Sequence, residues 1–379
     1  MTFFERNKKN LTILLAIIAF WAFAYYVRDL PLTPPNGVNF TGGDTEGYVE
    51  ATRFIKTGVT TMSGWYPNHL LTNFAYLHYL IFFEKFGNIY LGWIILNSLF
   101  YILSGFILYK IIYRIFNSDG VALIGTTLFL GNYAAITFGL HYLTDMGSWM
   151  FYLAAAYFAL EYAYTERYKF IYYASIMTGI GGLFKEYALG GYAITVGVIT
   201  YMAYARGKKF MSPFVLATMI SFVPFTLVQI YVYLQYHYSY LDWVRSPHSS
   251  SGYDSKIVEH IKVLIYLFNF AYTLFFYSAY LIYKNYKKYF DQRTLVYLCI
   301  VFISASPIFL WPGITERLDF VVVPFMILVS CVAVKEHEDR LTWFLPLGVI
   351  YLVTSFCMDA YILQPEWKQT LIGFIKNII

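Results

Sequence analysis

Long apolar runs separated by short charged segments follow one another along the chain. A helix needs about 20 predominantly apolar residues to cross a bilayer. The first run, residues 11–27, is followed by Arg28 and Asp29 with no small-residue cleavage site, so we expect an uncleaved anchor helix and not a signal peptide. The pattern predicts about eleven crossings, at residues 11–27, 89–112, 120–139, 144–163, 169–184, 187–204, 212–236, 257–283, 294–311, 318–334 and 341–360.

A further apolar stretch at residues 70–83 is too short for a crossing. It follows Pro67 and ends at Glu84 and Lys85. We therefore predict an interfacial or re-entrant helix there. The expected fold class is an all-α polytopic membrane protein, whose first outer loop contains juxtamembrane helices.

Composition supports this class and excludes others. Of the 379 residues, 59% are hydrophobic and only 13% are charged, whereas soluble domains carry about 25% charged residues. A surface this apolar would aggregate in water. The net charge of +5 is not gathered into a basic stripe, which argues against nucleic-acid binding. Cys299, Cys331 and Cys357 lie in apolar runs without metal or redox spacing, so we interpret them as buried small hydrophobic residues.

The distribution of basic residues predicts the orientation. With the N-terminus inside, 16 of the 27 Lys and Arg residues fall in the cytoplasmic segments, as the positive-inside rule requires. The prediction is one transmembrane domain, residues 1–379, in the plasma or inner membrane. Its non-cytoplasmic features are an outer loop at 28–88, a second at 237–256 and a C-terminal tail at 361–379 that resembles an amphipathic surface helix. The cytoplasmic turns contain no Walker loop, so any chemistry is expected on the outer face.

Two acidic residues lie at the start of the helix that is predicted in the first outer loop. Asp44 and Glu46 follow Gly42 and Gly43 and precede a segment with helical spacing. Asp44 fits a helix N-cap, and a carboxylate at this place also fits a general base. Both roles can hold together.

Three more ionisable clusters fall at the same face. They are His141 to Asp145, Lys185 with Glu186, and Glu316 to Asp319. Ionisable groups in a membrane face a polar cavity or a partner. A helix cap for Asp145, snorkelling or a local salt bridge for Lys185, and an ion pair of Arg317 with Glu316 or Asp319 are the structural alternatives. Their convergence on one face favours a single outer-face active site.

These motifs, in this order, resemble those of GT-C glycosyltransferases over residues 1–330. The similar enzymes are the dolichyl-phosphate-mannose protein mannosyltransferase-like and lipid-A aminoarabinose transferase-like ones. The matching segments are Asp44-Thr45-Glu46-Gly47-Tyr48 with Ala51 and Gly58, Pro67-Asn68-His69-Leu70-Leu71 with Phe86-Gly87-Asn88, Leu143-Thr144-Asp145, Leu183-Phe184-Lys185-Glu186, and Glu316-Arg317-Leu318-Asp319 with Pro324. The chain departs from the pattern at Asp319, where an apolar or aromatic residue is usual, and in the order of Pro67 and His69.

The resemblance implies transfer of a sugar from a polyprenyl-phosphate donor to a lipid, glycan or protein acceptor on the non-cytoplasmic face. Asp44 would deprotonate the acceptor, with inversion at the anomeric carbon. Glu46 or Asp145 would position the acceptor or hold a divalent cation, a choice that stays open, and no other cofactor is implied. Lys185 and Arg317, assisted by His141, would bind the leaving phosphate. The residues assigned to the acceptor or to gating are Tyr48, His69, Trp243, Arg245 and Glu186.

Other interpretations of the sequence stay open. The aromatic segment at 237–256 also fits an interfacial aromatic belt with a polar loop. A polar-lipid transporter or flippase would place charges along a substrate path, but the sequence shows no internal repeat and no paired broken helices. A polymerase or ligase for lipid-linked glycans would be expected to carry a longer outer loop late in the chain.

Overall fold

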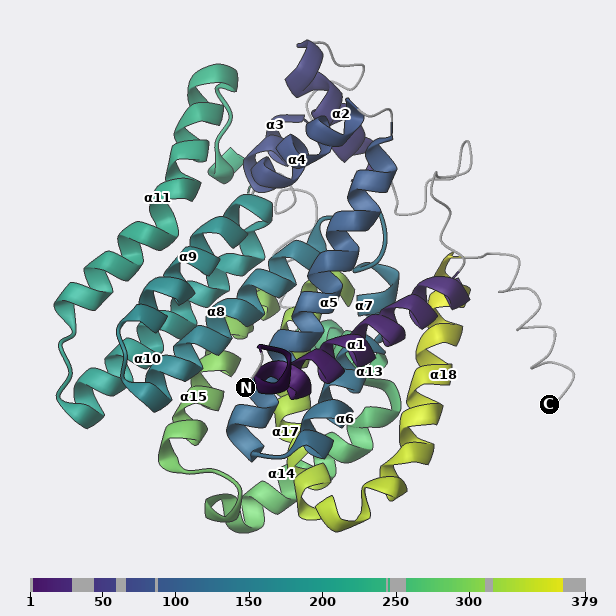
Figure 1. The fold of residues 1–379 in the computed structure, drawn as a ribbon. Helices are drawn as coiled ribbons and strands as arrows, with labels where there is room; N and C mark the ends of the chain where they lie inside the picture. The colour runs from purple at the N-terminus through teal and green to yellow at the C-terminus, as the bar shows by residue number, and fades with distance from the viewer. Residues whose placement is uncertain are drawn as a thin grey trace, which may run out of the picture.

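The computed structural model describes residues 3–28, 44–58, 66–85, 88–242, 245, 257–310 and 316–363. Every regular element in these ranges is a helix (Figure 1). The predicted all-α class is therefore confirmed. The first part of the chain forms α1 (Phe3–Arg28), α2 (Asp44–Thr57), α3 (Tyr66–Thr72), α4 (Phe74–Glu84), α5 (Ile89–Phe116), α6 (Asp119–Leu130), α7 (Tyr133–Thr137), α8 (Asp145–Thr165) and α9 (Lys169–Phe184).

The second part contains the remaining long helices and several short 3₁₀ turns. In order they are η1 (Glu186–Leu189), α10 (Gly190–Arg206), α11 (Met211–Tyr236), α13 (Ile257–Phe268), η2 (Asn269–Ala271), α14 (Tyr272–Asn285), η3 (Tyr286–Lys288), α15 (Gln292–Ala305), η4 (Ser306–Leu310), α16 (Glu316–Asp319), η5 (Phe320–Val322), α17 (Val323–Glu336), η6 (Glu338–Trp343) and α18 (Phe344–Leu363).

Eight helical stretches in the described residues are long and apolar enough to cross a membrane. They are Lys8–Val27, Ile89–Phe116, Glu186–Arg206, Met211–Tyr236, Ile257–Lys288, Gln292–Phe309, Glu316–Glu336 and Glu338–Met358. The other three predicted crossings coincide with α6 plus α7, with α8 and with α9, which do not meet both criteria. The stretch at 70–83 is divided by Asn73 between α3 and α4 and is not among the eight.

The core lies along α8 and α17, in which almost every side chain is buried. In contrast, α1, α11 and α18 expose large apolar side chains such as Leu15, Leu227 and Val353, as helices facing lipid do. Small residues let the central helices approach closely. A Cβ at Gly191 of α10 would lie 2.6 Å from the Cβ of Ala155 of α8, so these two helices pack nearly backbone to backbone.

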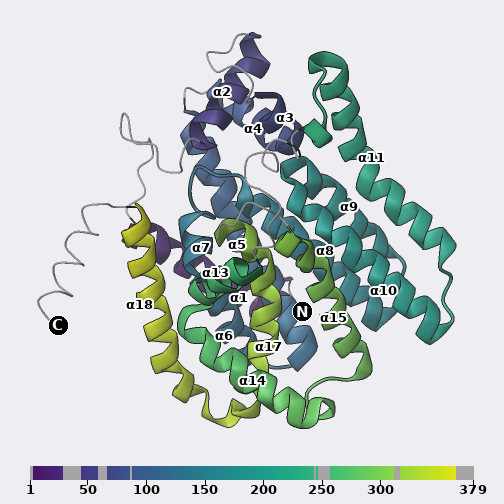
Figure 2. The same cartoon turned by 180° about the vertical axis from the view of Figure 1, so that it is seen from behind.

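Ion pairs between helix ends distinguish one end of the bundle from the other. Lys9 with Asp119 (2.8 Å), Arg114 with Glu161 (3.3 Å), Lys208 with Glu166 (2.7 Å) and Lys288 with Glu336 (2.6 Å) form ion pairs at one end, which we call the basic end. Helices α2, α3 and α4 lie at the opposite end, and both views place them at the top of the molecule (Figures 1 and 2). The basic end holds the segments predicted to be cytoplasmic. Its orientation toward the cytoplasm stays a prediction.

Candidate active site

A fully buried carboxylate, Asp145, lies at the first position of α8, at the end of the bundle that carries α2 to α4. Its Oδ1 accepts a hydrogen bond from Lys185 Nζ at 2.8 Å. Its Oδ2 lies 3.9 Å from Arg317 Nη1. We call these three residues the Asp145 cluster. It joins α8, the break between α9 and η1, and α16, and it carries one net positive charge when all three groups are ionised.

The electrostatics of the cluster depend on mutual compensation, because isolated buried charges are strongly unfavourable. Burial by itself lowers the pKa of Lys185, but the Asp145 carboxylate, with smaller contributions from Tyr187 and Tyr48, more than offsets it and raises the pKa above its ordinary value. The ammonium is therefore held in its charged form. Asp145 Oδ2 has no hydrogen-bond partner in the described part of the chain, and 3.9 Å is too long for a hydrogen bond to Arg317. A buried acceptor without a partner requires a physical explanation, and here two cations lie beside it.

Lys185 reaches α8 because α9 packs unusually close to it. A Cβ at Gly181 would lie 2.5 Å from the Cβ of Phe151 of α8 and 2.6 Å from the Cβ of Ala188. Lys185 itself has an extended backbone, which ends α9 before η1 begins. The glycines that precede Lys185 in the sequence thus place the lysine against the start of α8.

The segment that leads into Asp145 is buried although it is not helical, so its backbone carbonyls need internal partners. Trp93 Nε1 donates to the Leu143 carbonyl at 2.9 Å, and the Asn97 side chain donates to the carbonyls of Leu143 and His141. Thr45 of α2 donates to the Tyr142 carbonyl at 3.1 Å. These bonds fix the approach to Asp145 and tie the start of α2 to it. They also place His141 on this anchored segment.

Two further predicted residues, Tyr48 of α2 and His69 of α3, pack together beside the segment that leads into Asp145. Tyr48 OH accepts a hydrogen bond from Thr144, the residue before Asp145, at 3.3 Å. The Tyr48 ring packs on His69 of α3, with centroids 4.6 Å apart. Close contact between α2 and α3 requires a glycine, since a Cβ at Gly47 would lie 2.4 Å from His69 Nε2.

Gly47→Ala is therefore expected to lower the apparent unfolding temperature of the purified protein. The clash with the buried His69 ring costs about 1–3 kcal/mol, which outweighs the roughly 1 kcal/mol that alanine gains over glycine in a helix. Gly348→Ala is the matched control, because nothing lies within 4 Å of a Cβ there. Gly47→Ala/His69→Ala should recover part of the loss. Equal unfolding temperatures for the two alanine variants would refute the proposed packing.

The other predicted residues have different surroundings. Glu186 follows Lys185 directly, and its Oε2 is buried with no hydrogen-bond partner among the described residues. Glu46 is exposed on the face of α2 opposite Thr45 and Tyr48, and Arg245 is also exposed. Their predicted roles stay predictions. The side chain of Asp44 and all of Trp243 lie outside the described residues, as do 246–256 and 364–379. No group of three or more His, Cys, Asp or Glu residues suited to a metal occurs in the part of the chain the structure describes.

A second buried pair was not predicted from the sequence. His260 Nδ1 of α13 and Asp319 Oδ1 of α16 form a hydrogen bond of 2.7 Å, and both side chains are fully buried. Phe320, the next residue, packs on Trp149 of α8 with centroids 4.3 Å apart. The pair fixes the four-residue α16, and therefore Arg317, against α13 and α8. His260 gave no local signal, because its partner lies 59 residues further along the chain.

Removing one member of this pair should be far worse than removing both. His260→Leu leaves the Asp319 carboxylate buried without its partner, and we expect a loss of about 3–5 kcal/mol in the free energy of unfolding. His260→Leu/Asp319→Leu should recover most of that loss. The measurement is denaturant-induced unfolding in detergent micelles. A single variant as stable as the double variant would contradict the assigned pairing.

Comparison with solved structures identifies a fold of the same kind. The structure is similar to the crystal structure of ArnT from Cupriavidus metallidurans bound to undecaprenyl phosphate, with a TM-score of 0.61 and 14% sequence identity. The match covers 93% of this chain and 64% of the ArnT chain, so this chain spans less than two thirds of that protein. No family model and no curated protein matches the sequence. At this identity the likeness shows the fold alone, and it confirms the GT-C-like fold expected from the sequence.

Proposed function

We propose that this ArnT-like chain is a membrane glycosyltransferase, which moves a sugar from a polyprenyl-phosphate donor to an acceptor on the non-cytoplasmic face. The Asp145 cluster is the observation that supports this proposal most directly. It contains the buried Lys185 and Asp145 and the partly buried Arg317, which meet at a single end of the bundle. The ArnT structure contains undecaprenyl phosphate, whose phosphate is the kind of group that such cations bind.

Lys185 and Arg317 have complementary properties as phosphate ligands. Lys185 supplies a compact charge that Asp145 holds at 2.8 Å. Arg317 is only partly buried, and its planar guanidinium can bind two phosphate oxygens at once. When the bond between the anomeric carbon and the phosphate oxygen breaks, negative charge grows on the phosphate. Both cations stabilise that charge without protonating the leaving group.

The acceptor side of the reaction is assigned to the start of α2. The acceptor hydroxyl or amine forms the new bond to the anomeric carbon, and its proton passes to the carboxylate of Asp44. Attack from the side opposite the phosphate inverts the anomeric centre. The hydrogen bond between Thr45 and the Tyr142 carbonyl supports this assignment, because it ties the residue after Asp44 to the segment preceding Asp145.

The remaining predicted residues receive supporting roles. His141 assists at the phosphate, while Tyr48, His69 and Glu186 line the acceptor side. Glu186 follows Lys185 directly in the chain. Tyr48 accepts a hydrogen bond from Thr144, the residue before Asp145. Glu46, Trp243 and Arg245 are assigned to acceptor positioning and gating. A divalent cation at Glu46 or Asp145 is not required by this scheme, because the side-chain cations already face the phosphate.

The lipid carrier explains how such a site operates within a bilayer. A polyprenyl chain lets the donor diffuse in the membrane and enter laterally between helices. The sugar then reaches the site without a soluble nucleotide-binding domain. In this proposal the protein is integral to the plasma or inner membrane, with the N-terminus in the cytoplasm and the Asp145 cluster at the opposite side.

A donor screen tests the proposed function. The full-length protein, reconstituted in liposomes, is incubated with a set of radiolabelled polyprenyl-monophosphate sugars and with extracted membrane lipids, glycans or proteins as acceptors. We expect label to move from the donor to one acceptor class, with release of polyprenyl phosphate. Movement of labelled lipid across the bilayer without a new glycoside would instead establish a flippase. Transfer only from polyprenyl-diphosphate oligosaccharides would establish a polymerase or ligase.

A further inference from the structure

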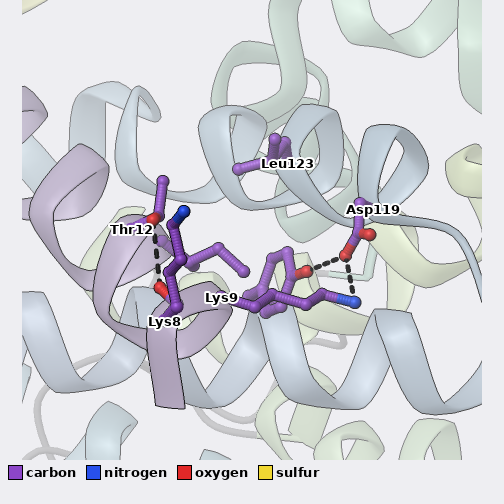
Figure 3. A pocket seen from close by; sticks show the side chains of 7 residues that line it. Lys8, Lys9, Thr12, Asp119 and Leu123 are labelled. Carbon is purple, nitrogen blue, oxygen red and sulfur yellow. Dashed lines mark hydrogen bonds and ion pairs between the residues drawn. The ribbon is translucent and has the colours of Figure 1, made fainter. Parts of the chain in front are cut away.

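A pocket lies at the basic end, away from the Asp145 cluster and from the proposed transfer reaction. Its volume is about 490 Å³, and it is bounded by α1, α5 and α6. Figure 3 shows Lys9 of α1 reaching toward Asp119 of α6, while Lys8 lies beside Thr12 of α1 and Leu123 of α6 also lines the pocket. We propose that this pocket binds one anionic phospholipid, whose headgroup phosphate contacts the lysines and whose acyl chain follows the groove between α1 and α6.

The polar rim of the pocket is built around one fixed lysine. Lys9 Nζ pairs with Asp119 Oδ1 at 2.8 Å and lies 3.9 Å from the centroid of the Tyr113 ring. Tyr109 OH donates to the same carboxylate. Both contacts are made to Oδ1 of Asp119, and they hold Lys9 at the rim of the pocket.

The balance of charge at the rim is positive. Lys8 is exposed, and no ion pair to it is found among the residues that the structure describes. Lys110 of α5, the residue after Tyr109, donates to the side chain of Asn10 of α1. The pocket lining thus contains two lysines and one carboxylate, and Lys110 adds a third cation next to it. Such basic pockets between transmembrane helices favour lipid headgroups that carry a negative charge.

The floor of the pocket is apolar, which distinguishes a lipid from a free anion. Ile13 of α1, Leu123 of α6 and the ring of Tyr109 form this floor. Leu123 is 40% exposed, although it lies on an apolar helix within the bundle. The first candidate crossing begins at Lys8, so the rim lies where the helix enters the bilayer. An acyl chain covers this floor, and a phosphate ion alone cannot.

Lipid binding to the full-length protein tests the proposal. The purified protein in neutral detergent is titrated with dioleoyl-phosphatidylglycerol, dioleoyl-phosphatidylcholine or inorganic phosphate. Retained lipid is measured by native mass spectrometry, and stabilisation is measured as the rise in unfolding temperature. We expect phosphatidylglycerol to be retained at one high-affinity site and to raise the unfolding temperature. The other two probes should leave both readouts unchanged.

Three variants locate the site. Lys8→Gln should weaken the apparent affinity for phosphatidylglycerol about 5-fold, the effect of one lysine near an anionic surface. Leu123→Trp should fill the groove and abolish retention while the lipid-free unfolding temperature stays near that of the wild type. Lys287→Gln, an exposed lysine of η3 outside the pocket, should have no effect. Equal effects of Lys8→Gln and Lys287→Gln, equal retention of both lipids, or the same stabilisation by inorganic phosphate would overturn the proposal.

Discussion

Replacement of Lys185 by Met is expected to lower the rate of sugar transfer by about 10²- to 10³-fold. That is the usual cost of removing one group that stabilises charge developing in a transition state. In the proposed reaction the charge develops on the departing phosphate, and the almost fully buried Lys185 is the cation assigned to stabilise it. The measurement is single-turnover transfer from the radiolabelled donor. Donor binding should weaken less than the rate falls, because the phosphate charge increases during the reaction.

Lys185→Met also leaves Asp145 buried without its ion-pair partner, so a loss of folding has to be separated from a loss of chemistry. Lys185→Met/Asp145→Asn removes both charges and should restore the unfolding temperature toward that of the wild type. Transfer should stay at the level of the single variant. If the double variant regains both stability and transfer, the pair is only structural, and the phosphate site must lie elsewhere.

Asp44→Asn is expected to lower the transfer rate by about 10²- to 10⁴-fold, the range that a positioned general base contributes. Asparagine preserves the size of the side chain and, like aspartate, is favourable at the start of a helix, so the variant should fold normally. The KM for the donor should change little, because the proposal assigns the phosphate contacts to Lys185 and Arg317. The readout is the rate of transfer at saturating donor, followed over a range of pH.

The matched control for this variant is Asp339→Asn, which removes an exposed carboxylate near Arg340 in η6, in the connection from α17 to α18. It should transfer sugar at the wild-type rate. A well-folded Asp44→Asn variant with unaltered transfer would remove the assigned base. Hydrolysis of the donor without transfer would indicate that Asp44 holds the acceptor and does not accept its proton.

Several features followed from the sequence because their physical causes are local. The bilayer sets the length of each apolar run, so the membrane class and eight of the eleven predicted apolar spans could be predicted without a structure. Alternation of crossings then assigned Asp145, Lys185 and Arg317 to one end, and the structure brings these three together. The single crossing predicted at 120–139 is instead divided into α6 and α7, because Asn132 caps α7 with its own side chain.

Other features depend on how helices rotate and pack, which no local pattern specifies. The rotation of α2 turns Glu46 outward and Tyr48 inward, although both belong to the same short motif. The pairing of Asp319 with His260 requires α13 and α16 to meet across 59 residues of chain. The pocket around Lys9 exists only because α1 packs beside α5 and α6. Local apolar length and charge determined which end of the bundle each residue occupies, and only tertiary packing decided which side chains meet there.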